Sequence, residues 1–252
     1  MKGVVLAGGT GSRLYPLTRI TNKHLLPIYD KPMIFYPIEA LVRAGLHDIM
    51  VVTGGNNAGD FLRLLANGRD FGLKRLHYAY QDGAGGIGEA LALAHEFVAG
   101  DRCVLILGDN LVEDDLTPFV RNFAAQKAGA RILLKEIPER QHLIHLGVPV
   151  IEDHRVVRIE EKPAEPKSPY AVTGIYMYDA DVFDIVEQLA PSGRGELEIT
   201  DVNNEYIRRG VMEYDVLQGF WGDAGESIDH YNNVINYVAN HWPRQPVAEN
   251  IS

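Results

Sequence analysis

The chain has 252 residues, of which 46% are hydrophobic and 23% are charged, an ordinary globular composition that allows a substantial buried core. Its formal net charge of −10 argues against a general nucleic-acid binder, because phosphate backbones attract basic surfaces. No apolar run has the length of a membrane-spanning helix, no signal-peptide pattern opens the chain, and Cys103 is the only cysteine. We therefore expect a cytoplasmic protein without an internal disulfide and without a membrane partner.

The first half of the chain repeats a short apolar strand, a turn and an amphipathic helix. Strands are expected at 3–7, 48–53, 76–80, 103–107 and 131–134, and helices at 32–44, 60–66, 89–98 and 116–128. Pro37 argues against an unbroken helix over the first of these helical ranges. Strands that alternate with helices predict an α/β fold with a mainly parallel sheet covered on both faces.

The pattern changes after about residue 140. A hairpin is expected from strands at 148–151 and 156–159, a further strand at 171–177, and helices at 182–189, 197–209 and 228–240. The final dozen residues are polar and contain proline, which predicts a loose tail. We expect a single domain over 1–252 with two lobes, the first at about 1–135 and the second at about 136–240.

A glycine-rich loop, Gly8-Gly9-Thr10-Gly11-Ser12-Arg13, follows the first predicted strand directly. Open α/β sheets place ligands at this end of a strand, and backbone N–H groups of such loops close on phosphate oxygens. The loop lacks the Gly-Lys of a Walker motif, and Leu14 stands where a dinucleotide fingerprint needs its last glycine. A tight structural turn is the alternative, but the nearby cations Arg13 and Lys23 favour phosphate binding.

Two aspartates stand beside glycines after predicted strands. Asp109 lies in the run Leu105-Ile106-Leu107-Gly108-Asp109-Asn110, and Asp223 lies in Trp221-Gly222-Asp223-Ala224-Gly225. Mg²⁺ prefers one or two carboxylates with water and substrate phosphates, so the pair suits a two-carboxylate metal site. Taken singly, each is equally well a carboxylate that caps a turn. The rival acids are Asp114, Asp115 and Asp201.

Other polar residues carry weaker signals. The run Glu160-Glu161-Lys162-Pro163 ends a predicted strand with a cation suited to a second phosphate, although an exposed charged turn is the commoner role. The nine histidines, with His142 and His145 in a polar connection, are expected at the surface or in caps. Cys103 is expected to be a small core residue.

Six segments in family order and spacing resemble the glucose-1-phosphate thymidylyltransferases, over residues 1 to about 225. They read GGTGSRLYPLT, NKHLLPIYDKPMI, LILGDN, IEEKP, EPKSPYAVTGIYMYD and GELEITDVNNEYI. The resemblance is to the short form of the family, close to members of spore-coat and related polysaccharide pathways. It implies a Rossmann-like nucleotidyltransferase fold with a smaller sugar-binding lobe, and a homo-oligomer such as a dimer or tetramer.

The resemblance also implies a reaction and a set of residues. dTTP and α-D-glucose 1-phosphate would give dTDP-glucose and pyrophosphate, with Mg²⁺ as the cofactor. The family's nucleotide-binding positions match Gly8, Gly9, Thr10, Gly11, Ser12, Arg13, Gln81, Gly86 and Asp109. Its catalytic cations match Arg13, Lys23 and Lys162, and its metal ligands match Asp109 and Asp223. Its sugar-phosphate positions match Gly147, Glu161, Lys162, Val172, Thr173 and Tyr176.

Several alternatives stay open at this level. The carboxamide of Gln81 offers a donor and an acceptor to thymine or uracil, and the loop at 82–88 departs from that of the long enzymes, so UTP is an alternative to dTTP. Departures at Leu146, Gly222 and Ala224 leave another sugar 1-phosphate open. A non-catalytic sugar-nucleotide sensor is the remaining alternative. Retention of the five charged positions of the motifs favours the enzyme.

Overall fold

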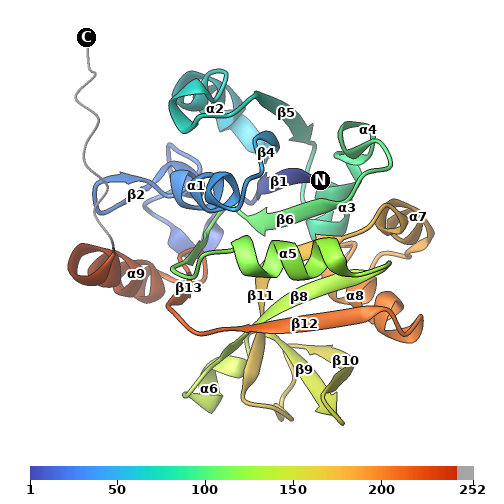
Figure 1. Cartoon of the computed structure of the whole chain (residues 1–252). Coiled ribbons are helices and arrows are strands. Elements are labelled where there is room, and N and C mark those ends of the chain that lie inside the picture. Colours follow the sequence, from blue (N-terminus) through green and yellow to red (C-terminus); the bar gives the residue numbers. More distant parts are fainter. Residues whose placement is uncertain (243–252) are drawn as a thin grey trace.

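The computed structural model describes residues 1–242, so the tail predicted for the end of the chain falls mainly outside the described residues. Its centre is a seven-stranded sheet in the order β12-β8-β11-β6-β1-β4-β5 (Figure 1). The strands are β1 (Lys2–Ala7), β4 (Asp48–Gly54), β5 (Arg75–Gln81), β6 (Cys103–Leu107), β8 (Ala130–Glu136), β11 (Tyr170–Tyr178) and β12 (Met212–Leu217). Only β11 runs antiparallel to its neighbours β6 and β8, so the sheet is mainly parallel, as predicted.

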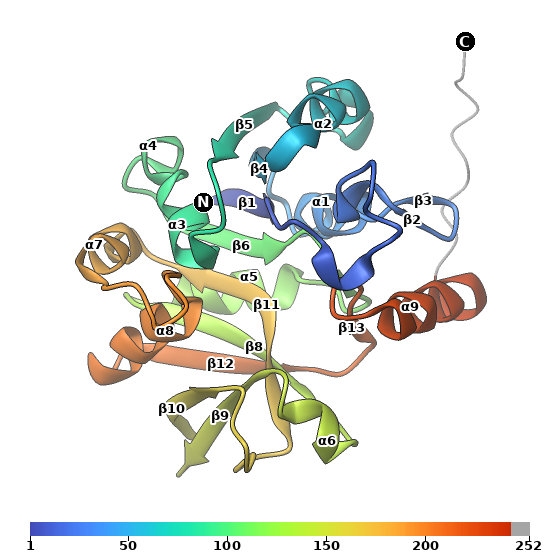
Figure 2. The same cartoon turned by 180° about the vertical axis from the view of Figure 1, so that it is seen from behind.

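Helices cover both faces of this sheet. One face carries α1 (Phe35–Arg43), α2 (Ala58–Leu65) and α5 (Thr117–Ala125). The opposite face, towards the viewer in Figure 2, carries α3 (Gly86–Ala92), α4 (His95–Val98), α7 (Asp181–Gln188) and α8 (Ile199–Arg208). The single helix predicted over 89–98 is wrong, because the chain turns at 93–94 and forms α3 and α4 instead. Pro37 lies in the first turn of α1, where its missing N–H has no intrahelical partner to lose.

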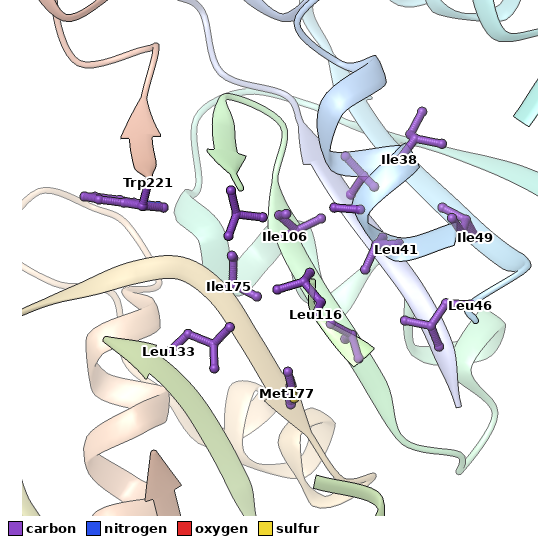
Figure 3. Packing of buried hydrophobic residues seen from close by; sticks show 14 of the residues in the cluster. Ile38, Leu41, Leu46, Ile49, Ile106, Leu116, Leu133, Ile175, Met177 and Trp221 are labelled. Atoms are coloured by element: carbon purple, nitrogen blue, oxygen red, sulfur yellow. The ribbon is translucent and has the colours of Figure 1, made fainter. Parts of the chain in front are cut away.

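The core consists of two apolar layers, one on each face of the sheet. Alternate residues of β1 divide between them, with Val5 and Ala7 in the first layer and Val4 and Leu6 in the second. Figure 3 shows part of the first layer, where Ile38 and Leu41 of α1 pack towards Ile106 of β6. Because these strands are buried on both faces, their sequences are continuous apolar runs, and for this reason they could be predicted from the sequence.

Smaller elements surround the sheet. A hairpin of β9 (Gly147–Glu152) and β10 (Arg155–Glu161) projects from it together with the short helix α6 (Arg140–Leu143) (Figure 1). The remaining elements are β2 (Pro27–Ile28), β3 (Lys31–Pro32), β7 (Asn110–Val112), β13 (Trp221–Asp223) and α9 (Ile228–His241). The central sheet takes strands from both predicted lobes, because β11 and β12, which follow residue 135, pair with β6 and β8 of the first lobe. None of the helices described in residues 1–242 is both long and apolar enough to cross a membrane.

Candidate active site

A cavity of about 440 Å³ opens at the carboxyl ends of the parallel strands β1 and β6. Its walls come from the glycine-rich loop, the turn after β6, the end of β5, the start of α3, the hairpin and the loop after β13. The predicted site residues that line it are Gly8, Gly9, Thr10, Gly11, Ser12, Arg13, Lys23, Gln81, Gly86, Asp109, Gly147, Glu161, Lys162, Val172, Tyr176 and Asp223. The structure therefore brings together every predicted site residue except Thr173.

The glycine-rich loop leaves β1 at Ala7 and closes into a short 3₁₀ turn at Ser12–Leu14. Gly11 has φ +67°, and a Cβ there would lie 2.8 Å from Cγ2 of Thr18, so the turn requires glycine on both counts. Thr18 Oγ1 donates a hydrogen bond of 2.9 Å to the Gly11 carbonyl. The fully buried Leu14 anchors the turn in a third apolar cluster, while Arg13 stays exposed at the cavity wall.

Strand pairing brings the two predicted metal carboxylates together. Asp109 follows β6, and the next residue, Asn110, pairs with Asp223 in the two-stranded ladder of β7 and β13. The Ala224 N–H donates to the Asp109 carbonyl at 2.9 Å, which fixes the second loop against the first. A Cβ at Gly225 would collide with Oδ2 of Asp109, so only glycine lets the backbone approach so closely.

The charges of this cluster are unbalanced. Lys23 Nζ forms a buried ion pair with Asp109, and Asp223 lies close enough to act on both groups. Burial works to raise the pKa of Asp109, but the charge of Lys23 holds it well below its usual range. Burial and the neighbouring Asp109 carboxylate raise the pKa of Asp223 to about 7. Two buried carboxylates with one lysine leave negative charge uncompensated, and this oxygen donor set suits a hard divalent cation.

His24 lies beside the cluster and is buried, so the surface or capping role expected of the histidines is wrong for this one. Its side chain is buried, with Nδ1 2.7 Å from Oδ1 of Asn22, and it packs against Gly108. Burial, followed by the charge of Lys23, lowers the pKa of His24 to about 3. The ring is therefore neutral, and it packs beside the Lys23–Asp109 ion pair without adding a charge.

The predicted base-reading residue Gln81 is already partly engaged within the protein. Its Nε2 donates to the Gly86 carbonyl at 3.1 Å and to Oε2 of Glu89 at 2.7 Å. Both amide hydrogens are then used, which leaves Oε1 as the group available to a base. This arrangement departs from the expected donor and acceptor pair, and it identifies Glu89 as a positioning residue that sequence reasoning missed.

The opposite wall carries most of the predicted sugar-phosphate residues. Glu161 ends β10, and its Oε2 accepts a hydrogen bond of 2.8 Å from Thr200 Oγ1 of α8, a contact not foreseen from the sequence. Lys162 follows with φ +48°, an unusual backbone conformation for a lysine that is common at functional sites. Its exposed ammonium group stands at the cavity wall.

Thr173 does not reach the cavity. Val172, Gly174 and Tyr176 of β11 line it, and Thr173 between them points to the other face of the sheet. There its hydroxyl donates 2.8 Å to the carbonyl of Leu133 and is fully buried. The strand's alternation therefore gives Thr173 a role within the sheet, and the placement of this residue in the sugar pocket is wrong.

The rival acids have structural roles. Asp114 accepts the N–H groups of Gln218 and Gly219, and Asp115 caps Thr117 at the start of α5. Asp201 is exposed on α8 and does not line the cavity. The two carboxylates at the cavity are therefore Asp109 and Asp223 among the acids weighed for a metal.

Comparison with known proteins agrees with the predicted family and fold. A family model described as nucleotidyl transferase matches residues 2–240, and the chain belongs to this family of enzymes. It is 42% identical over 247 residues to a glucose-1-phosphate thymidylyltransferase of Neisseria meningitidis, covering 95% of this chain and 84% of that protein. It is 45% identical over 243 residues to one from Actinoplanes sp., covering 94% and 78%. The predicted family is thus confirmed.

Solved structures agree as well. A candidate glucose-1-phosphate thymidylyltransferase from Bacillus anthracis, in complex with sucrose, superposes with a TM-score of 0.91 at 46% identity, covering 97% of this chain and 98% of that one. A UDP-glucose pyrophosphorylase with bound UDP-glucose shares the fold, with a TM-score of 0.82 at 24% identity, covering 94% and 98%. The predicted nucleotidyltransferase fold is confirmed by both.

Proposed function

We propose that the chain transfers the thymidylyl group of dTTP to α-D-glucose 1-phosphate, giving dTDP-glucose and pyrophosphate with Mg²⁺ as the cofactor. The observation that carries the proposal is the single cavity lined by the glycine-rich loop, the Lys23–Asp109–Asp223 cluster and Lys162. The named activity of the relatives from Neisseria meningitidis and Actinoplanes supports the choice of thymine and glucose.

The chemistry requires no nucleophile from the protein. A phosphate oxygen of the sugar 1-phosphate attacks the α-phosphorus of dTTP in line, the bond from that phosphorus to the β-phosphate's bridging oxygen breaks, and pyrophosphate leaves. The protein contributes by holding two anions in register and neutralising their charge. Arg13 and the glycine-rich loop suit the departing pyrophosphate, Lys23 the α-phosphate, and Lys162 the sugar phosphate.

The metal would be held by Asp109 and Asp223. When bound, Mg²⁺ supplies positive charge to the phosphate oxygens beside the reacting phosphorus. Without it, the Asp223 carboxylate is a buried charge that Lys23 does not offset alone, as its pKa of about 7 indicates. This imbalance supports the assignment of the pair as the metal ligands.

The choice of nucleotide base and of sugar is the most specific part of the proposal. Oε1 of Gln81 suits the N3–H of thymine, and because uracil carries the same group, UTP is the alternative nucleotide. Another sugar 1-phosphate is the alternative acceptor. The homo-oligomer expected from the family resemblance stays a prediction, which analytical ultracentrifugation tests.

A pyrophosphate-release screen tests the proposal. The wild-type protein is incubated with Mg²⁺ and every pair drawn from the common NTPs and dNTPs and several sugar 1-phosphates. We expect the highest kcat/KM with dTTP and glucose 1-phosphate, and a strong loss in Arg13→Ala. Release with a different pair would correct the substrate while keeping the reaction. No release with any pair, together with tight dTDP-glucose binding, would support the sensor instead.

A further inference from the structure

Three side chains next to the cavity gather in a way that the reaction does not require. His142 lies on α6, Glu226 in the loop after β13, and His230 in the first turn of α9. His142 Nε2 lies 2.7 Å from Glu226 Oε2, and His230 Nδ1 lies 3.8 Å from Glu226 Oε1. The two imidazole rings stack with 4.6 Å between their centroids. These contacts go beyond the surface or capping role expected for His142 from the sequence.

The group has the geometry of a metal ligand set. One ligand atom from each side chain lies within 4.8 Å of the other two. Zinc binds histidine nitrogen and carboxylate oxygen at about 2.0–2.2 Å, so ligand atoms around one ion lie roughly 3.3 Å apart. The His142–Glu226 and His230–Glu226 distances of 2.7 and 3.8 Å lie on either side of this spacing. All three side chains are partly shielded from solvent, Glu226 the most.

The surroundings favour a cation. His142 Nε2 lies within hydrogen-bonding distance of the Glu226 carboxylate, and the charges of Glu139 and Asp223 add to the negative field around it. The same negative field attracts a metal ion, which would take the place of the proton between His142 and Glu226. Ser227 Oγ lies 3.0 Å from Nδ1 of His230, a contact that an ion bound at this nitrogen would replace.

We propose that His142, Glu226 and His230 form a second metal site, which takes a transition-metal ion of the Zn²⁺ class. Two imidazoles and one carboxylate suit Zn²⁺ and Co²⁺, whereas the oxygen ligands Asp109 and Asp223 suit Mg²⁺. Three protein ligands leave a fourth position for water or for an oxygen of a substrate. Glu226 itself lines the cavity, so this position lies beside the substrates.

The site would connect two walls of the cavity. α6 precedes the hairpin that carries Glu161 and Lys162, and Glu226 lies three residues after Asp223. The Glu226 N–H also contacts the Asp223 carbonyl, at 3.4 Å. An ion shared by α6, this loop and α9 would therefore hold the sugar-phosphate side against the loop of Asp223.

Cobalt spectroscopy tests the proposal directly. The metal-free wild-type protein is titrated with Co²⁺ in excess Mg²⁺, which keeps the oxygen site occupied. We expect one equivalent to bind with the intense visible absorption of four-coordinate, nitrogen-ligated Co²⁺, and Zn²⁺ to displace it. Octahedral Co²⁺ on carboxylates absorbs only weakly, so the spectrum separates the two sites.

Variants identify the ligands. His142→Gln and His230→Gln should each abolish the intense absorption, while His241→Gln, a control on the same helix α9, should retain it. Far-UV circular dichroism of the metal-free variants checks that they fold, and a Zn²⁺-dependent rise in Tm should occur in the wild type and the control only. Wild-type absorption in either ligand variant, or no intense absorption in the wild type, would overturn the site. The readout is independent of turnover, so its failure leaves the proposed reaction standing.

Discussion

At the scale of single residues, the Lys23–Asp109–Asp223 cluster sets two carboxylates beside one lysine, so its charges do not balance within the protein. Replacing Asp223 with Asn keeps its shape and removes its charge. Because charge-stabilising contacts in a low-dielectric site contribute strongly to rate, we expect kcat to fall by about 10²-fold or more. Steady-state pyrophosphate release measures the effect, with the exposed Asp184→Asn of α7 as the control. Turnover near the wild-type value would contradict the two-carboxylate metal site.

The hydrogen bond between Gln81 and Glu89 provides a second test. In Gln81→Glu a carboxylate faces Glu89 where an amide donated at 2.7 Å, so repulsion should turn the side chain away from the base. We expect KM for dTTP to rise by about 10-fold, a change worth about 1.4 kcal/mol. The additional change Glu89→Gln should restore part of the loss, because the pair can again donate and accept. Additive effects of the two changes would show that Glu89 does not position Gln81.

Prediction of single residues from the sequence succeeded where a motif sets a polar side chain or a glycine directly after a buried strand. The glycines, Arg13 and Asp109 follow strands that meet at one edge of a parallel sheet, so their convergence is implied by the strand pattern. The prediction for Thr173 was wrong because the assignment to the sugar pocket ignored which face of β11 each residue occupies. The contact between His142 and Glu226 joins segments 84 residues apart, which no local pattern records, and the contact between Gln81 and Glu89 depends on how the loop between β5 and α3 folds.

At the scale of elements, Asn204 of α8 joins the hairpin to the main body. Its Oδ1 accepts from the Ile159 N–H at 2.9 Å and its Nδ2 donates to the Ile159 carbonyl at 3.0 Å. Since Ile159 lies two residues before Glu161, these two hydrogen bonds fix the position of the end of β10.

We expect Asn204→Ala to lower the free energy of unfolding by about 1–3 kcal/mol, because it leaves two backbone groups without their partners. It should also raise KM for the sugar phosphate more than KM for dTTP, since β10 leads into Lys162. Urea denaturation and initial rates measure the two effects, with the exposed Asn233→Ala of α9 as the control. An equal rise in both KM values would argue against this coupling.

Whether a strand could be predicted from the sequence depended mainly on how deeply it is buried and on its length. Continuous apolar runs marked β1, β4 and β6, which are covered on both faces. β12 went unnoticed because it is an edge strand, half-exposed along most of its length, and mixes Glu213 and Asp215 with apolar residues. β7 and β13 are too short for any period to show, although their pairing is what assembles the carboxylate pair.

At the scale of the whole molecule, Cys103 reports on global unfolding. It lies fully buried at the start of β6, between β1 and β11 in the middle of the sheet, and burial raises the pKa of its thiol to about 12. We expect no reaction of the native protein with a thiol reagent between pH 7 and pH 9, and complete reaction in denaturant. Rapid labelling of the native protein would show that the sheet opens locally at β6.

The same thiol measures ligand binding. dTTP with Mg²⁺ at 100 times its Kd should stabilise the folded state by about 2.7 kcal/mol. Where opening is fast relative to labelling, this corresponds to labelling about 100-fold slower. dCTP at the same concentration is the matched control, because it has the same sugar and its cytosine carries no N3–H for Gln81. Equal protection by both nucleotides would contradict base selection by that residue.

The ladder between β7 and β13 has a consequence for how the chain is made. Asp109 emerges from the ribosome in the first half of synthesis, whereas its partner Asp223 arrives only near the end. A nascent chain that has already formed the glycine-rich loop and β6 thus carries half of the carboxylate pair. The carboxylate pair is therefore complete only after the last strand has been synthesised and has joined its partner.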